Sequence, residues 1–341
     1  MRFAFTDDQL AFREAVRDLL AVECPPGVVR AAWPGATSGA GARSAPDDVS
    51  RVWTALGEMG VLGLAVPEQH GGLGLAELDW VLLAEETGYA ALPHPFVETV
   101  SVAGPLLARL GDPGARLAGL VAGELTITAQ FDDSTLVPFG QSADVFLLRC
   151  DDGLHVVGRD EAMCAPMDSV DGSRRLAQLT SEPGGSPLLA HHDGELDRAF
   201  DRGALGTAAQ LLGLGRRMLD MTVGYVKERH QFGVPVGSFQ AIKHHLADVA
   251  LLLTFAAPAV HRAAYSLATD APTSGRDVSM AKAMASDAAR LAARQSLQCH
   301  GAIGYTVEYD LHLFLKRAEA LARTWGDAAW HRRRIATGLG I

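Results

Sequence analysis

The chain has 341 residues, 48% of them hydrophobic, which is long enough for two or three domains with substantial cores. Its formal net charge of −10 argues against the dense basic surface that nucleic-acid binding requires, and the short basic run at residues 332–334 is better suited to closing a helix. The four cysteines form no C-x-x-C pair, and we find neither a signal peptide nor an apolar run long enough to cross a bilayer, so we expect a cytoplasmic protein without a metal site or a membrane partner.

Helical periodicity dominates the first third of the chain. Thr6 and Gln9 can form a capping box in front of an amphipathic helix, and further helices are predicted at about residues 47–59, 77–87 and 98–110. The stretch at residues 24–46 is rich in Pro, Gly, Ala and Ser and predicts a loop. We therefore predict an N-terminal helical domain over residues 1–123.

Residues 60–74 read G-V-L-G-L-A-V-P-E-Q-H-G-G-L-G. Their glycines could be mistaken for a phosphate-binding loop, but they lack the preceding strand and following helix of a dinucleotide fingerprint. We interpret them as turns that let the chain wrap between helices.

The hydrophobic periodicity of the sequence changes from helical to strand-like after residue 124. Short β-type runs at residues 126–131, 143–148 and 154–157 are separated by turn sequences, which predicts a small β-domain over residues 124–200. Helical patterns return from residue 201, with long helices predicted at about 205–226, 240–267, 277–299 and 311–334. Four helices of this length predict a bundle over residues 201–341, and alanine-rich faces predict burial against other subunits.

Residues 227–249 are the most distinctive stretch, because polar and aromatic side chains gather at a corner between two predicted helices. Arg229 offers a planar charged fork that suits a phosphate or pyrophosphate. Phe232 and Phe239 offer flat apolar surface, and Gln240 offers both a donor and an acceptor. The pattern is typical of a binding site for a large polar ligand.

The same corner also admits an interpretation without a ligand. Gly233 could end the first helix in the left-handed conformation, and Ser238 could cap the second helix. The residues by themselves leave both interpretations open.

Residues 229–248, R-H-Q-F-G-V-P-V-G-S-F-Q-A-I-K-H-H-L-A-D, resemble the R-x-Q-F-G-x-P-[IVL]-x-x-F-Q-x-[IV]-x-x-x-L-A-D signature of the flavin-dependent acyl-CoA dehydrogenase family. Residues 298–305, Q-C-H-G-A-I-G-Y, are similar to its Q-x-x-G-G-x-G-[YF] turn, and residues 60–74 to its G-x-x-G-x-x-x-P-E-x-x-G-G-x-G segment. The resemblance implies a mostly α fold with a small β-domain: an N-terminal helical domain, a reduced middle β-domain and a C-terminal four-helix bundle.

The resemblance also implies that the corner contacts FAD held mainly by a neighbouring subunit. The family positions that contact the flavin match Arg229, Gln231, Phe232, Gln240, Gln298 and Gly301. We add Phe239 and Ala302 to this predicted cofactor-binding set. His300 replaces a residue that abuts the adenosine portion of the flavin in the family, so it is a further candidate for ligand contact.

The middle third of the chain departs from the family. Ordinary members carry a T-E-x-x-A-G-S-D loop and a K-x-W-I-[TS]-N strand, which hold the flavin ring and part of the acyl thioester. Neither string is present, and residues 136–144, L-V-P-F-G-Q-S-A-D, take their place. This departure counts against flavin-ring and thioester binding by the chain's own middle domain.

The catalytic base of the family is also missing. Removing a weakly acidic C–H proton needs a fixed carboxylate, which the family supplies as a glutamate at one of two positions. Trp325 and Gly203 stand at those positions here. Asp327 and Asp201 lie nearby in sequence and are weak candidates, because a shorter side chain rotated by about one helical step is poorly placed to reach the same carbon.

The chain keeps the flavin-contacting positions of the corner and lacks the middle-domain strings and the base. This combination predicts the smaller subunit of a heteromeric acyl-CoA dehydrogenase, similar to the paired actinobacterial enzymes that act on bulky or steroid side-chain CoA thioesters. The implied partners are the acyl-CoA substrate, a larger FAD-carrying subunit in an α2β2 heterotetramer, and electron-transfer flavoprotein or a similar acceptor. Two alternatives stay open: a self-sufficient homomeric dehydrogenase that uses Asp327 or Asp201, and a flavin-free acyl-CoA-binding or scaffold protein.

Overall fold

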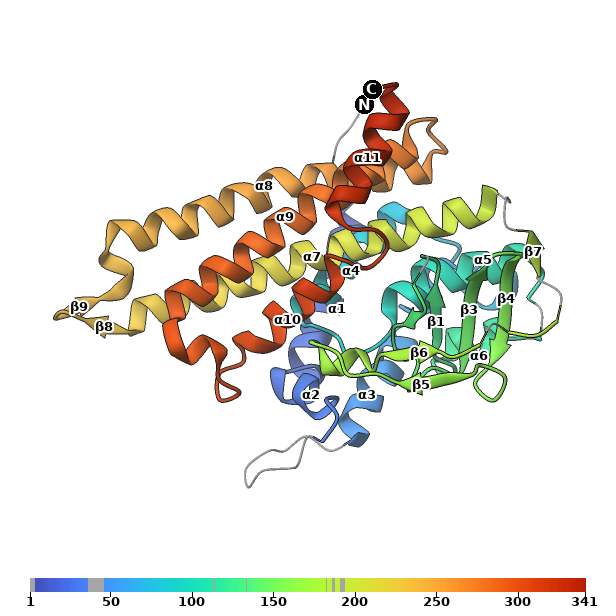
Figure 1. The fold of residues 1–341 in the computed structure, drawn as a ribbon, viewed down its shortest axis with the longest axis horizontal. Helices are drawn as coiled ribbons and strands as arrows, with labels where there is room; N and C mark the ends of the chain where they lie inside the picture. Colours follow the sequence, from blue (N-terminus) through green and yellow to red (C-terminus); the bar gives the residue numbers. More distant parts are fainter. Residues whose placement is uncertain are drawn as a thin grey trace.

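Long helices form one side of the molecule and short strands the other (Figure 1). The computed structural model describes residues 4–35, 46–112, 114–132, 134–181, 183–185, 188–190 and 194–341. Helices precede and follow a strand region that lies between residues 127 and 190. The mostly helical architecture that the sequence predicts is therefore confirmed.

The N-terminal helices begin where the local sequence favours a helix start. Thr6 Oγ1 accepts a hydrogen bond from Gln9 N at 3.2 Å, and Thr6 N donates to Gln9 Oε1 at 2.9 Å, so the predicted capping box is formed. The elements of this part are α1 (Asp7–Glu23), α2 (Pro26–Ala31), α3 (Pro46–Glu58), η1 (Glu68–His70), α4 (Glu77–Tyr89), η2 (Val97–Ala103), α5 (Gly104–Arg109) and α6 (Leu117–Ala122).

Two of these elements differ from the sequence prediction. The sequence predicts a loop at residues 24–46, but α2 lies within it, because Pro26 stands in the first helical turn, where its missing N–H is not needed. Residues 36–45 of that loop lie outside the described residues. The sequence also predicts one helix over residues 98–110, whereas the π-helix η2 is followed by α5, since Pro105 has no N–H to continue the α-helical pattern.

A buried carboxylate joins three helices. Glu86 of α4 is 2% exposed and pairs with Arg13 of α1 at 2.7 Å and with Arg216, on the helix after the strands, at 3.1 Å. Arg17 of α1 adds a third guanidinium at 3.1 Å. Burial alone would raise the pKa of Glu86, but the three arginines outweigh burial and lower it from 4.5 to about 2.

Glu86 is therefore expected to stabilise the fold above pH 4.5 and to lose this contribution as the pH falls toward 2, because its folded pKa lies below its unfolded one. Glu86→Gln should be less stable than the wild type at neutral pH, and the difference should shrink through this window. Chemical unfolding midpoints measured across the pH range test this. Glu58→Gln, at an exposed glutamate of α3, is the control, and a gap that persists at pH 2 would contradict the prediction.

Two glycines let α4 contact the long helix α7 (Gly194–Glu228) backbone to backbone. A Cβ at Gly88 would lie 2.1 Å from Gln210 O, and a Cβ at Gly213 would lie 1.9 Å from Glu85 O. Only glycine allows this separation, so the N-terminal helices are held directly against the C-terminal ones.

The strands between residues 127 and 190 form two small sheets. The first has the order β1-β3-β4-β7, with β1 parallel to β3 and the other pairs antiparallel, and the second is antiparallel with the order β2-β6-β5. The strands are β1 (Ile127–Gln130), β2 (Leu136–Val137), β3 (Val145–Cys150), β4 (Gly153–Gly158), β5 (Cys164–Pro166), β6 (Ala177–Leu179) and β7 (Leu189–Ala190).

The side chains of β3 alternate between two hydrophobic cores, so the first sheet lies between them. Val145 and Leu147 belong to the main core that the helices share, while Phe146 and Leu148 belong to a smaller core with Val137 of the second sheet. Successive side chains of a strand point to opposite faces, so one sheet can serve both cores.

The C-terminal part is built from α7, α8 (Gln240–Ala268), α9 (Ser274–His300), α10 (Leu311–Leu321) and α11 (Ala328–Leu339). The helix α7 begins at Gly194, before the residue 201 at which the sequence predicts the C-terminal domain to start, because acidic residues in its first turn favour a helix start. In Figure 1, α7, α8 and α9 run alongside one another.

The sequence predicts a single last helix over residues 311–334, whereas the structure divides it into α10 and α11. The chain turns at Trp325 and Gly326, whose φ values of 56° and 85° are left-handed. The buried ammonium of Lys282 holds this turn by donating to Ala322 O at 3.3 Å and to Gly326 O at 3.0 Å. Burial lowers the pKa of Lys282 to about 7.

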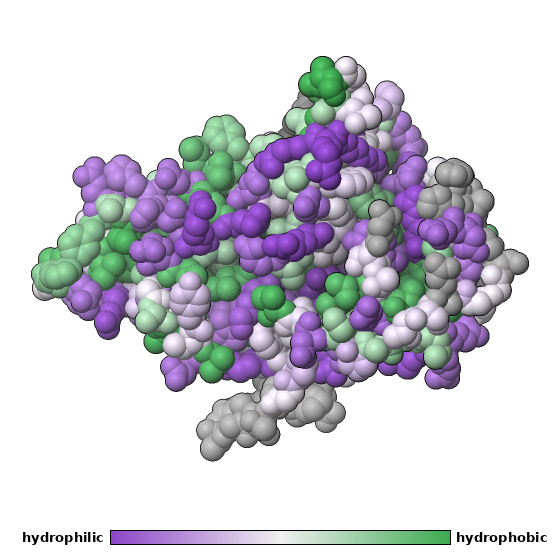
Figure 2. All heavy atoms as spheres, in the orientation of Figure 1, coloured by the Kyte–Doolittle hydropathy of each residue, from purple (hydrophilic) through white to green (hydrophobic). Residues whose placement is uncertain are grey.

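The helix α8 is long and apolar enough to cross a bilayer by length and composition alone. Charged residues interrupt it at Asp248 and Arg262, so the sequence prediction that no unbroken apolar run has this length still holds. Only 28% of its most apolar window is buried. Leu251, Leu252 and Phe255 are exposed on it, and Figure 2 shows apolar side chains along α8 and at the adjoining end of the bundle. This surface is suited to burial against another molecule.

Candidate functional site

The corner predicted from the sequence is a short hairpin at the end of the bundle (Figure 1). β8 (His230–Gln231) pairs antiparallel with β9 (Val234–Pro235), and the two residues between them, Phe232 and Gly233, have φ values of 53° and 83°. Positive φ at both central residues is typical of a tight hairpin turn. Gly233 thus adopts the left-handed conformation in a hairpin, and not as the cap of a helix.

The start of the helix after the hairpin, α8, also differs from what the interpretation without a ligand predicts. α8 begins after Phe239, and no side chain caps it by a hydrogen bond. The Ser238 hydroxyl donates instead to Pro235 O at 2.7 Å. A capped restart at Ser238 is therefore wrong, because that hydroxyl bonds within the short 3-10 turn η4 (Val236–Ser238) that precedes α8.

The predicted cofactor-binding side chains of the corner face outward. Phe232 is 93% exposed, and its ring meets that of Phe239 edge to face, with centroids 6.2 Å apart. Arg229, Gln231 and Gln240 are also exposed. Within the part of the chain that the structure describes, the guanidinium of Arg229 pairs with no carboxylate. The corner therefore presents a free cation beside two aromatic rings.

The second predicted segment lies where α9 ends and η5 (Gly301–Tyr305) begins. Gln298, Gly301 and Ala302 are exposed there. The ring of His300 stacks on that of Tyr225, with centroids 4.3 Å apart, which fixes the end of α9 against the last turns of α7. The structure thus brings the helix ends that carry both predicted segments together.

His300 itself lies behind this surface. Its ring is buried, Nδ1 lies 2.7 Å from Ser296 O, and burial lowers its pKa. Nε2 has no hydrogen-bond partner among the described residues. The ring therefore supports the turn by stacking, which its place in the sequence did not indicate.

Gly203 and Trp325, the two positions at which the sequence was searched for a base, lie against each other. A Cβ on Gly203 of α7 would lie 2.5 Å from the indole of Trp325. Trp325 is 3% exposed, and its ring lies 5.7 Å from that of Phe131 and 5.8 Å from that of Phe200. An aromatic cluster therefore fills the space beside Gly203.

The two weak candidates for the base have structural partners. Asp201 is buried and forms an ion pair with Arg334, and burial raises its pKa although the arginine opposes this. Asp327 accepts a hydrogen bond from Trp330 N at 2.7 Å as the N-cap of α11, and this bond lowers its pKa. A low pKa and an exposed position make Asp327 a weak base.

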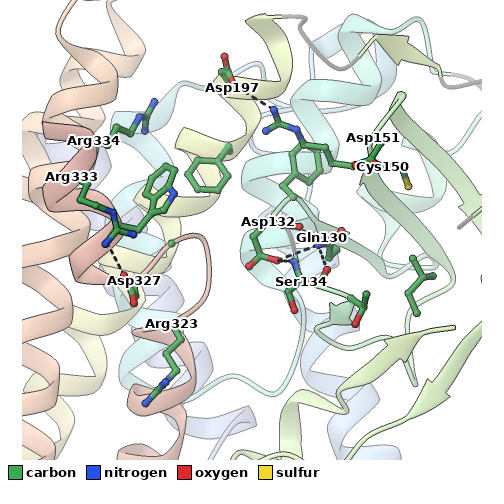
Figure 3. A pocket seen from close by; sticks show the side chains of 17 residues that line it. Gln130, Asp132, Ser134, Cys150, Asp151, Asp197, Arg323, Asp327, Arg333 and Arg334 are labelled. Carbon is green, nitrogen blue, oxygen red and sulfur yellow. Dashed lines mark hydrogen bonds and ion pairs between the residues drawn. The ribbon is translucent and has the colours of Figure 1, made fainter. Parts of the chain in front are cut away.

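A pocket of about 880 Å³ lies between the strand region and the C-terminal helices (Figure 3). Acidic and basic side chains share its wall, namely Asp132, Asp151, Asp197, Asp327, Arg149, Arg323, Arg333 and Arg334. Several are paired, such as Asp197 with Arg149 at 3.8 Å. Sequence reasoning missed this pocket because segments far apart in the chain build its walls and none carries a motif.

The two regions differ in how well they suit a flavin. The hairpin offers a free guanidinium and aromatic surface, which fit a pyrophosphate and a flat ring system. The strand side carries residues 136–144, which match neither of the two family strings, and the buried Trp325 ring. Among the described residues, no group of three or more His, Cys, Asp or Glu side chains could hold a metal ion.

Comparison with protein families matches residues 6–120 to "Acyl-CoA dehydrogenase, N-terminal domain" and residues 196–340 to "Acyl-CoA dehydrogenase, C-terminal domain". Acyl-CoA dehydrogenase IpdE2 of Mycobacterium tuberculosis is 35% identical over 318 residues, which cover 93% of this chain and 92% of that protein. Acyl-CoA dehydrogenase FadE34 of the same organism is 33% identical over an alignment of 363 positions, which covers 98% of this chain and 49% of that protein.

Two solved structures have similar folds. A chain of the ChsE4-ChsE5 complex from Mycobacterium tuberculosis superposes with a TM-score of 0.83 at 22% identity, covering 100% of this chain and 99% of that one. A chain of the Tcur3481-Tcur3483 steroid acyl-CoA dehydrogenase superposes with a TM-score of 0.84 at 24% identity, covering 98% of each chain. At these identities the likeness concerns the fold alone.

Proposed function

Because this chain belongs to the acyl-CoA dehydrogenase family, whose members are oxidoreductases acting on CH–CH bonds, we propose that it is the subunit of a heteromeric enzyme that lacks the catalytic base and completes the FAD site of its partner. One observation supports the proposal: the side chains that match the family's flavin-contacting positions in the hairpin face outward, while the indole of Trp325 covers Gly203, so that neither predicted base position carries a carboxylate. The chain would contribute binding surface, and the larger subunit would contribute the chemistry.

The hairpin would hold the flavin from outside. Arg229 would pair with the pyrophosphate, Phe232 and Phe239 would cover an apolar face, and Gln240 would bond a polar edge. Members of the family normally bind FAD, which when bound accepts the hydride of α,β-dehydrogenation. Gln231 and the exposed turn formed by Gln298, Gly301 and Ala302 would complete the same contact surface.

The exposed apolar face of α8 supports assembly with a subunit of similar fold. We propose an α2β2 tetramer in which this face is buried between subunits. One structure of similar fold is a complex of two proteins and another is a steroid acyl-CoA dehydrogenase, and by analogy with them alone we propose a bulky or steroid acyl-CoA thioester as the substrate of the assembled enzyme. Electron-transfer flavoprotein or a similar carrier would accept the electrons, and the enzyme would work in cytoplasmic lipid metabolism.

Co-expression with a candidate larger subunit tests the proposal. The chain purified alone should lack the visible absorption band of oxidised flavin, and the co-purified complex should show it and scatter light as a tetramer. A band in the chain purified alone would favour a self-sufficient homomer. No band under either condition would favour a flavin-free acyl-CoA-binding or scaffold protein.

The chain by itself is expected not to oxidise straight-chain acyl-CoA, because Trp325 and Gly203 leave no base beside the substrate carbon. Turnover with an artificial electron acceptor measures this. Turnover that is present in the wild type and lost in Asp327→Asn would show that Asp327 is the base and that the proposal is wrong.

A further inference from the structure

A pocket of about 410 Å³ lies between α2, α3, the loop that precedes η2 and the loops of the strand region. It shares no lining residue with the pocket of Figure 3, and none of the described residues that line it comes after residue 175. Volumes of about 300–1,000 Å³ are typical of small-molecule sites. Neither the C-terminal helices nor the hairpin contributes a described residue to this pocket.

Arg175 is the one side chain that is charged at neutral pH among the described residues of this lining. Within the described part of the chain, its guanidinium forms no hydrogen bond or ion pair. Its φ of 44° is left-handed, a conformation that costs free energy in a residue with a side chain. The histidine of the lining, His94, is neutral because burial lowers its pKa to about 4. The pocket therefore presents one unpaired cation.

Two aromatic rings form a flat wall in the same pocket. The rings of Trp53 and His94 stack, with centroids 5.0 Å apart and planes 21° from parallel. His94 Nε2 lies 2.7 Å from Val49 O, and because a carbonyl only accepts, Nε2 carries the proton and holds the ring to α3. Trp53 is 3% exposed, and its Nε1–H has no acceptor among the described residues. The wall is suited to stacking with an aromatic ring.

The hydroxyl groups of the lining decide which anion fits. Ser142 Oγ donates to a backbone carbonyl at 3.2 Å, and Thr126 Oγ1 donates to Asp144 Oδ2 at 2.6 Å. Ser173 Oγ donates to Asp171 Oδ1 at 2.6 Å. Each hydroxyl has a single hydrogen, so these groups offer a ligand only lone pairs. A phosphate would lack donors here, whereas two parallel N–H bonds from one guanidinium satisfy a carboxylate.

We propose that this cavity, here called the Arg175 pocket, binds a small aromatic carboxylate. The carboxylate pairs with the guanidinium of Arg175, and the ring stacks on the wall formed by Trp53 and His94. The Arg175 pocket shares no described residue with the hairpin, so binding there depends neither on flavin nor on a partner subunit.

Isothermal titration of the full chain with benzoate and three analogues tests the proposal. Benzoate should bind roughly tenfold to hundredfold more tightly than benzyl alcohol, which lacks the charge. It should bind about twofold to tenfold more tightly than cyclohexanecarboxylate, which lacks the aromatic ring. Phenyl phosphate should bind more weakly than benzoate, because the committed hydroxyl groups provide no donors for its additional oxygens.

Substitutions locate the binding at this pocket. Arg175→Met should abolish the preference for benzoate over benzyl alcohol. Arg51→Met, at an exposed arginine of α3 outside the lining, should preserve it. Thr54→Trp narrows the pocket from an exposed position of α3 and should abolish benzoate binding, which keeps the test decisive if Arg175→Met does not fold.

Three results would overturn the proposal: no benzoate binding, equal affinity for benzoate and benzyl alcohol, or benzoate binding that is unchanged in Arg175→Met or in Thr54→Trp. Tighter binding of phenyl phosphate than of benzoate would overturn it in favour of a phosphate site.

Discussion

Arg229→Ala is expected to weaken FAD binding to the assembled complex by roughly tenfold to hundredfold, because a charge-assisted hydrogen bond contributes about 1.5–3 kcal/mol. The guanidinium is exposed on the hairpin and free of carboxylates in the described part of the chain, so nothing inside the chain competes with a pyrophosphate for it. Titration of FAD into the apo complex measures the dissociation constant.

Two further variants make this result specific. Arg229→Lys keeps the charge but loses the planar fork, and it should recover only part of the affinity. Lys243→Ala removes another exposed cation near the start of α8 and should leave the dissociation constant unchanged. If Arg229→Ala binds FAD as the wild type does while assembly is intact, the hairpin is not a flavin site and the chain is better described as a scaffold.

Arg317→Met should lower the free energy of unfolding by about 3–5 kcal/mol, the cost typical of breaking a buried ion pair. Arg317 of α10 is 3% exposed and donates to Asp171, to Ser173 Oγ at 2.7 Å and to Leu92 O at 2.8 Å. These bonds tie the strand region to the C-terminal helices, and removing them leaves Asp171 buried and unpaired. Chemical unfolding of the full chain measures the loss.

An exposed ion pair provides the matched control. Arg290 and Glu319 pair at 3.3 Å on the surface of α9 and α10. Arg290→Met should cost less than about 1 kcal/mol, because solvent screens such pairs. Similar losses in the two variants would mean that the Arg317 network contributes no more than a surface contact.

The sequence by itself determined the helical ends of the molecule and its family. The capping box at Thr6, the apolar periodicity and the long signature at residues 229–248 are local patterns, and local patterns fix helix starts, helix faces and motif positions. The sequence also predicted that Trp325 and Gly203 stand in place of the base, since each could be aligned on a neighbouring motif.

Only the tertiary structure showed how distant residues share space. Gly203 lies on α7 and Trp325 lies in the turn between α10 and α11, and only packing reveals that the indole of Trp325 covers the backbone of Gly203. The division of α10 from α11 depends on Lys282, a residue on a third helix, whose ammonium holds the turn. Arg175 likewise reads as an ordinary arginine until folding places it in the wall of a pocket. Burial and long-range contacts decide these features, and neither is encoded in the spacing of neighbouring residues.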